Sequence, residues 1–137
     1  VLEEEQIPFL DNMVVGGSYT IESGIEGARS LLASEQPPTA IFCFNDDIAI
    51  GAIHEIKKHG FRVPDDISVV GFDNIKVSAY MDPPLTTVDQ PAYEMGRSAV
   101  DVLVSMIKGE ALTRNREVLP FRLIERESSG PCNPDRA

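Results

Sequence analysis

The chain alternates between short, continuous apolar runs and longer segments whose apolar residues recur at helical spacing. Residues 40–44 (AIFCF) and 67–72 (ISVVGF) are apolar throughout, which is typical of strands buried on both faces of a parallel sheet. Shorter apolar runs predict further strands, and Pro120 places one of them at a sheet edge or at its own end. These shorter runs lie at 13–15, 86–88, 118–121 and 123–124.

Three segments are predicted to be helices, at 22–33, 46–59 and 91–108, because their apolar residues fall on one side of a helical turn. Gly60 and Gly109 mark the ends of the second and third segments, since glycine commonly follows the last turn of a helix. The resulting order is β-α-β-α-β-β-α-β, the alternation of a parallel sheet with covering helices. We therefore expect an α/β fold, a parallel-sheet lobe with helices on both faces.

Charge and termini narrow the classes of protein. The 137 residues carry a formal net charge of −10, and the 12 basic residues are scattered, so we do not expect this chain to bind free DNA. No apolar run approaches the roughly 18 residues that a membrane span needs. The chain opens on VLEEEQIPFL, without the basic start of a secretory signal and without an initiator Met, so we expect an excised fragment. Cys43 and Cys132 form no disulfide framework, which favours a reducing, cytoplasmic compartment.

Polar side chains follow the predicted strands at the points where the strands end. Tyr19 lies shortly after the run at 13–15, Asn45 follows 40–44, Asp73 follows 67–72, and Gln90 comes just after 86–88. Ligands of open parallel sheets bind beyond the carboxyl ends of the strands, so these four side chains should converge on one rim. An aromatic ring, amides and a carboxylate suit a hydroxyl-rich or heterocyclic small molecule.

Each rim residue also has a purely structural interpretation. Asn45 is equally suited to capping the helix that follows it. Asp73 is a common turn residue. Gln90 alone would be an ordinary surface residue, and Tyr19 alone would be a loop anchor. The functional interpretation depends on their joint placement.

The sequence gives no reaction to assign, and we expect no enzyme, no cofactor and no metal site. His54 and His59 lie on the same predicted helix, five residues apart, and neither has a nucleophile at motif spacing. Asp46-Asp47 and Asp65-Asp66 are interpreted as helix-start and turn acids. The phosphate-binding and zinc-binding motifs are absent from the sequence.

One helix carries apolar residues away from its core side. On 46–59, Ile50 lies nearly opposite the apolar stripe centred on Ala52, and Ile53 lies at its edge. Single exposed apolar residues are common, so the alternatives are an incidental exposure and a subunit interface built on this helix.

Three long segments resemble the LacI/GalR family of bacterial transcription repressors. They are TAIFCFNDDIAIGAIHEIKKHGFRVPDDISVVGFDNI, DPPLTTVDQPAYEMGRSAV and the terminal LIERESS, which together cover most of residues 38–129. The short segment GGSYTIESG is similar to the purine and cytidine repressor branch.

The resemblance implies a type I periplasmic-binding-protein-like domain of two lobes, with a small-molecule effector (nucleoside, purine or sugar) between them. It places 1–88 in part of the second lobe, and 89–112 in a crossing segment and a helix of the first lobe. Residues 113–129 would return to the second lobe as strands, and 130–137 would be a loose tail. DNA would be bound through an N-terminal module that this chain lacks.

The resemblance also assigns individual positions. Asn45, Asp73 and Gln90 match effector-contacting positions, and Tyr19 matches a position where an aromatic ring lies against the effector. Helix 46–59, with Ile50 and Ile53, and the stretch at 77–81, with Tyr80, match a dimer surface, so we expect a homodimer.

Two functions remain open at the level of sequence. One is the effector-sensing domain of a cytoplasmic repressor, in which binding changes operator affinity. The other is a periplasmic solute-binding protein that feeds a transporter and shares the Asn45 and Asp73 rim. In either case helix 91–108 has an apolar side that needs burial, so the isolated chain is expected to be marginally stable or to bury that side against another chain.

Overall fold

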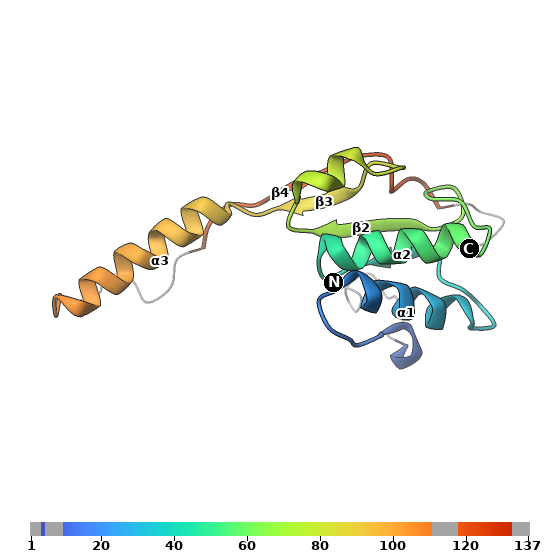
Figure 1. Ribbon diagram of the computed structural model, residues 1–137, viewed down its shortest axis with the longest axis horizontal. Coiled ribbons are helices and arrows are strands. Elements are labelled where there is room, and N and C mark those ends of the chain that lie inside the picture. The colour runs from blue at the N-terminus through green and yellow to red at the C-terminus, as the bar shows by residue number, and fades with distance from the viewer. Residues whose placement is uncertain (1–3, 5–9, 111–117, 133–137) are drawn as a thin grey trace.

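The sheet has four strands in the order β1-β2-β3-β4. Strands β1 (Ala40–Phe42), β2 (Ser68–Phe72) and β3 (Thr86–Asp89) are parallel, and β4 (Arg122–Ile124) runs antiparallel to β3 (Figure 1). The computed structural model describes residues 4, 10–110 and 118–132. The predicted α/β fold with a largely parallel sheet is confirmed.

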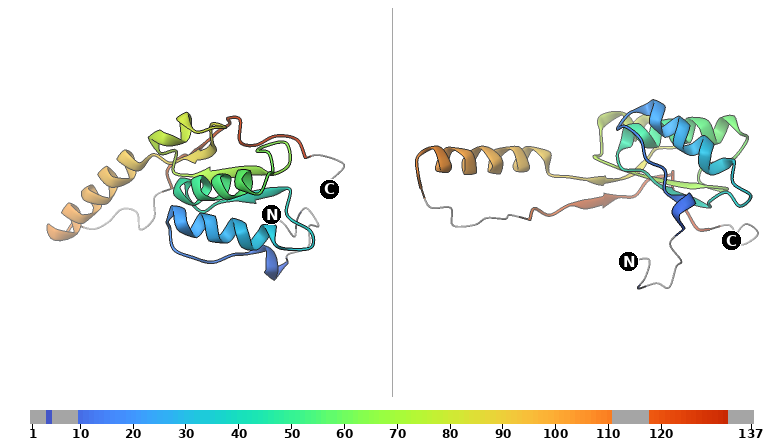
Figure 2. Two further views of the ribbon diagram at one scale, coloured as in Figure 1. Left: turned by 45° about the vertical axis from the view of Figure 1, so that its right-hand side comes forward. Right: turned by 90° about the horizontal axis from the view of Figure 1, so that it is seen from below.

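Two helices, α1 (Ile21–Leu32) and α2 (Asp46–Lys58), lie side by side over the same face of this sheet (Figures 1 and 2). Helices on both faces were expected, but in the part of the chain described here the opposite face carries Phe42, which is 67% exposed. The reason is topological. The strands are added in one direction, and successive right-handed crossovers in one direction place their connections on one face.

The contact between α1 and α2 depends on two glycines. A Cβ added to Gly24 would lie 2.1 Å from the backbone oxygen of Ile48, and one added to Gly51 would lie 2.0 Å from that of Ile21. No other residue lets the two backbones approach so closely. The core beneath them joins both helices to the sheet and consists of Ala28, Cys43, Ala49, Ala52, Ile53, Ile56, Ile67, Val69 and Leu85.

The helix limits follow from local signals that the sequence carries. Thr20 accepts a hydrogen bond from the backbone N–H of Ser23 and caps α1, and Asn45 accepts one from Ile48 and caps α2. Gly60 and Gly109 have φ values of +84° and +71°, the left-handed conformation that ends a helix at glycine. The predicted helices at 22–33, 46–59 and 91–108 are therefore confirmed to within one residue at each end.

The strand predicted at 13–15 is not formed. Residues Asp11–Met13 form a 3-10 turn, η1, and Val14 is 61% exposed. A groove of about 850 Å³ separates residues 13–19 from β1, which is paired only with β2 in the described chain. A strand needs a neighbouring strand to pair with its N–H and C=O groups. The apolar pattern of three residues does not indicate whether such a neighbour is present.

The third helix, α3 (Ala92–Ile107), extends away from the sheet (Figures 1 and 2). It follows β3 directly through Gln90 and Pro91, and it has no buried residue. Neither this helix, the longest of those described, nor the shorter ones combine the length and apolar character needed to cross a bilayer.

The C-terminal segment rejoins the sheet later than predicted. The strand expected at 118–121 is not observed, and β4 covers Arg122–Ile124, because Pro120 cannot donate to a strand neighbour. Beyond it, Ser128 Oγ donates to the Val69 oxygen at 2.6 Å. The tail expected to be loose from 130 is held at its first residue, where Gly130 N donates to Ser68 Oγ at 3.1 Å. Residues 133–137 lie outside the described chain, as do 1–3, 5–9 and 111–117.

Candidate functional site

Asp73 and Gln90 meet at the carboxyl ends of two neighbouring strands. Asp73 comes directly after β2 and Gln90 directly after β3, and the register pairs Phe72 with Val88. Gln90 Nε2 donates a hydrogen bond to Asp73 Oδ1. Within the described residues, Asp73 Oδ2 receives no hydrogen bond, so one carboxylate oxygen is available to a ligand donor.

The turn that presents Asp73 has an unusual backbone. Asp73 and Asn74 have φ values of 108° and 51°, both in a region that residues with a side chain rarely adopt. Such a conformation costs on the order of 1 kcal/mol or more per residue and persists only where the surroundings hold it. Here Asp73 N donates to the Val88 oxygen at 2.9 Å, and Asn74 N donates to Thr87 Oγ1 at 3.3 Å.

Polar side chains also fix the side chain of Asn74. Its Nδ2 donates to Asp89 Oδ1 at 3.0 Å, and its Oδ1 accepts from Arg126 at 2.8 Å. The amide of Asn74, and next to it the guanidinium of Arg122, hold the pKa of Asp89 below its ordinary value of 3.8. Asp89 is therefore ionised at neutral pH, and this side of the turn is a rigid, charged support.

Asn45 and Tyr19 form the other half of the rim. Asn45 Oδ1 accepts from Ile48 N at 2.8 Å, so the capping interpretation is correct, and Nδ2 donates to the Tyr19 backbone oxygen at 3.3 Å. The Tyr19 ring is 5.3 Å from that of Phe44, centroid to centroid, and Tyr19 is 65% exposed. One aromatic face is thus presented at the edge of the sheet where Asn45 lies.

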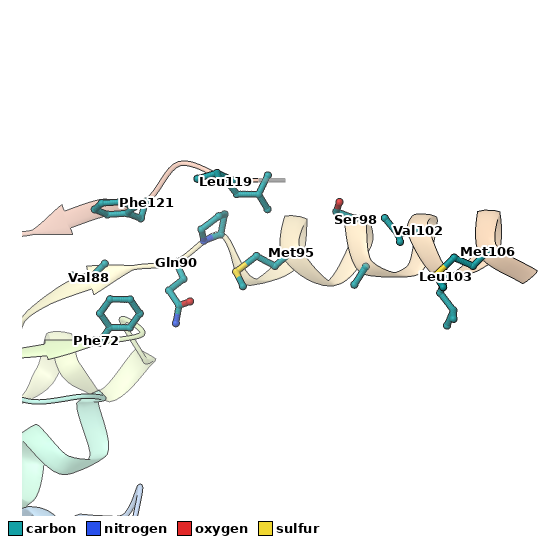
Figure 3. A pocket seen from close by; sticks show the side chains of 13 residues that line it. Phe72, Val88, Gln90, Met95, Ser98, Val102, Leu103, Met106, Leu119 and Phe121 are labelled. Atoms are coloured by element: carbon teal, nitrogen blue, oxygen red, sulfur yellow. The ribbon is translucent and has the colours of Figure 1, made fainter. Parts of the chain in front are cut away.

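The four predicted rim residues are consequently connected as two pairs, Tyr19 with Asn45 and Asp73 with Gln90. Each pair joins two segments at the carboxyl edge of the parallel strands. Gln90 lies where β3 leaves the sheet for α3 (Figure 3). There a groove of about 890 Å³ runs along α3, and its lining includes Gln90, Phe72, Met95, Val102, Met106 and Phe121.

Of the three residues expected at a subunit interface, two have side-chain surface to offer and one does not. Tyr80, at the end of η2 (Lys76–Tyr80), is 86% exposed, and Ile50 on α2 is half-buried. Ile53 is only 3% exposed and belongs to the core. A side chain so deeply buried offers no surface to another chain, which corrects the interface assignment of Ile53.

Two polar residues of the site escaped the sequence interpretation. Asp46, read as a helix-start acid, is fully buried and accepts hydrogen bonds from segments 29 to 41 residues away. Arg126 donates to both Asn74 and the Leu85 oxygen. The only local signal for Asp46 was its position directly after Asn45.

Two reactive side chains outside the rim, His59 and Cys43, interact with the fold itself. His59 Nδ1 lies 2.9 Å from the backbone oxygen of Glu55 on its own helix. Burial, followed by the charge of Asp46, raises the pKa of Cys43 to about 12, so its thiol is not a nucleophile at neutral pH. Within the described ranges, no three His, Cys, Asp or Glu side chains are placed to hold a metal ion.

The amino-acid sequence matches a known protein family and individual members of it. Residues 1–129 match the family described as the periplasmic binding protein-like domain. The chain is 40% identical over 116 residues to the HTH-type transcriptional repressor CytR of Escherichia coli (strain K12), covering 85% of this chain and 34% of CytR. It is 40% identical over 132 residues to the repressor PurR of Vibrio atlanticus, covering 96% of this chain and 40% of PurR. The chain therefore spans about a third to two fifths of the length of these relatives.

Solved structures agree with the sequence matches. A LacI transcriptional regulator from Bacillus cereus superposes with a TM-score of 0.92 at 31% identity, over 96% of this chain and 47% of that one. The transcriptional regulator CelR in complex with cellobiose superposes with a TM-score of 0.88 at 34% identity, over 93% of this chain and 39% of CelR. The lac repressor dimer bound to operator and an anti-inducer superposes with a TM-score of 0.80 at 33% identity, over 93% of this chain and 44% of that one. These proteins are regulators of transcription and not enzymes, which favours the repressor over the periplasmic alternative.

Proposed function

Because this chain belongs to the LacI family of transcriptional regulators, and carries their periplasmic binding protein-like domain, we propose that it is part of the effector-sensing domain of a DNA-binding repressor. Its role is to bind a small molecule at the polar rim and to couple that binding to operator affinity, which is a free energy shared between two sites.

The Asp73–Gln90 pair is the observation that carries this proposal. Gln90 holds one carboxylate oxygen of Asp73, and the turn backbone holds the residue in a conformation with positive φ. The second oxygen is suited to accept from a ligand hydroxyl or ring N–H, and the exposed ring of Tyr19 is suited to stack on a sugar or base. Nucleosides, purines and sugars share these features, and CelR was solved with cellobiose.

We assign residues 1–88 to the second lobe, 89–112 to a crossing segment and a helix of the first lobe, and 113–129 to the return into the second. The departure of α3 from the sheet beyond Gln90 supports this division, because a helix without a buried residue has its partners elsewhere. The rim described above is then one wall of a cleft, and the first lobe supplies the other.

Dimerisation and DNA binding complete the proposal. Ile50 and Tyr80 are suited to a homodimer surface, and operator binding is assigned to an N-terminal module in a cytoplasmic protein. With a net charge of −10 over its 137 residues, this chain is unsuited to attract DNA itself.

Calorimetry on the full-length protein tests this function. Cytidine, hypoxanthine and cellobiose represent the three classes of effector, and we expect one of them to bind saturably and to change operator affinity. Silence across all three, extended to other nucleosides, purines and sugars, would count heavily against an effector-sensing role. The coding sequence upstream of Val1 offers a separate check, because a helix-turn-helix identifies a repressor and a signal peptide identifies a transport protein.

A further inference from the structure

Asp46 is more deeply buried than a helix-start acid needs to be. It is the first residue of α2, where a carboxylate gains from the helix dipole while remaining in water. Its neighbour Asp47 is half-buried, as that role predicts, whereas Asp46 is 0% exposed. A buried carboxylate is costly unless hydrogen bonds satisfy it, so its surroundings need a separate explanation.

Three donors from outside α2 satisfy the Asp46 carboxylate. Thr87 Oγ1 in β3 donates to Oδ1 at 2.5 Å. The backbone N–H of Ile75 donates to Oδ2 at 2.9 Å, and Ser78 Oγ in η2 donates to the same oxygen. The fold also leaves room for this carboxylate, because a Cβ added to Gly71 in β2 would lie 2.3 Å from Asp46 Oδ1.

These contacts hold both ends of the segment that follows β2. Ile75 comes directly after the turn of Asp73 and Asn74, and Ser78 lies within η2. The Thr87 hydroxyl donates to Asp46 and also accepts from Asn74 N at 3.3 Å. It therefore connects the Asp46 carboxylate to the strained turn through two hydrogen bonds. The same acid therefore fixes the turn that aims Asp73 and the short helix that carries Tyr80.

We propose that Asp46 is a positioning residue for effector binding, which holds the Asp73–Asn74 turn through Thr87 and Ile75 and links it to η2 through Ser78. Asp46 does not itself touch the effector, because its carboxylate is enclosed by the three donors. This inference rests on the proposed function, since it concerns the aim of Asp73 toward an effector.

The Thr87→Val and Thr87→Ser variants of the full-length protein give the sharpest test. Valine keeps the shape of threonine and loses the hydroxyl, whereas serine keeps the hydroxyl. We expect faster amide hydrogen exchange at Asn74 and Ile75 in T87V, with affinity for cytidine, hypoxanthine or cellobiose, whichever binds, reduced about 10-fold to 100-fold. T87S should behave as the wild type in both measurements.

Asp46→Asn and Asp47→Asn form a matched pair of charge removals in one helical turn. D46N should weaken binding, and D47N should not. If D46N fails to fold, the threonine pair still decides. Wild-type exchange at Asn74 and Ile75 in T87V overturns the positioning role whether or not a compound binds. Loss of binding in Asp73→Ala together with wild-type binding in T87V overturns the positioning role alone, whereas wild-type binding in D73A overturns the proposed site itself.

Discussion

Gln90 Nε2 donates a hydrogen bond to Asp73 Oδ1 and so joins the residue after β2 to the residue after β3. The two lie 17 positions apart in the sequence and meet because parallel strands end at the same edge. Within the described residues, the other Asp73 oxygen receives no hydrogen bond, and Gln90 also lines the groove along α3 (Figure 3).

Replacing Asp73 by glycine should preserve more stability than replacing it by alanine. Both variants lose the Gln90 contact, but only the alanine variant is destabilised by a φ of 108°, because a residue with a Cβ is strained there. We expect Asp73→Gly to be more stable than Asp73→Ala by about 1 kcal/mol in urea unfolding of the full-length protein. At exposed Glu26 in α1 the order should reverse, because glycine is the poorer helix residue. Equal stability of the two Asp73 variants would argue against a strained turn.

The aromatic ring at Tyr19 should contribute to affinity through its face. Tyr19→Ala removes the ring that contacts Phe44 and should weaken binding of the recognised compound about 10-fold, as expected for a stacked ring. Tyr19→Phe keeps the ring and should bind within about 2-fold of the wild type, since the hydroxyl is not needed for stacking. Isothermal titration measures both. Wild-type affinity in Y19A removes Tyr19 from the rim.

Glu55 should make stability depend on pH in the acidic range. Arg29 Nε donates to its carboxylate at 2.8 Å and lowers its pKa below the ordinary value of 4.5, aided by Lys58 and His59. A depressed folded-state pKa stabilises the fold above the unfolded value, and this contribution is lost as pH falls through the folded value. The stability advantage of wild type over Glu55→Gln should therefore be constant above about pH 5 and shrink below it.

Chemical unfolding across pH 3 to 7 measures that difference, with the exposed Glu26→Gln as the matched control on α1. The control should differ little from the wild type at any pH in this range. An advantage of wild type over E55Q that grows toward low pH would contradict the assigned pairing with Arg29.

The exposed side of α3 should make the isolated chain associate or remain marginally stable. Met95, Val102 and Met106 line the groove along α3 (Figure 3), and all three are exposed in the described chain. Sedimentation of this chain should show concentration-dependent association, or thermal unfolding should show a low midpoint, or both. The double variant V102N/M106N should reduce association, whereas Asp101→Asn, on the same helix, should not. A rigid monomer of high thermal stability would refute this expectation.

The helices were predictable because their signals are local. Asn45 at the start of α2 and glycines 60 and 109 beyond the ends of two helices act within one turn of the backbone. The positions of Asn45, Asp73 and Gln90 at one edge were predictable for a related reason, since the ends of parallel strands share an edge, whereas Tyr19 follows no strand in the described chain. Asp73 and Gln90 could thus be placed near each other without knowing their contact.

Features that depend on distant partners could not be predicted in the same way. The run at 13–15 is as apolar as a strand, yet Val14 is exposed because no neighbour pairs with it in the described chain. Asp46 carries the same local pattern as Asp47, and its burial depends on Ile75, Ser78 and Thr87. The single-sided helix layer follows from strand order, which hydrophobic periodicity does not encode.

The most direct test of the effector-binding rim is a calorimetric titration of full-length Asp73→Ala beside Asp47→Ala with whichever of cytidine, hypoxanthine and cellobiose binds the wild type. Loss of a hydrogen bond to a ligand hydroxyl costs about 1–3 kcal/mol, so D73A should bind roughly 10-fold to 100-fold more weakly, while D47A binds as the wild type. Wild-type affinity in a folded D73A protein would contradict the account.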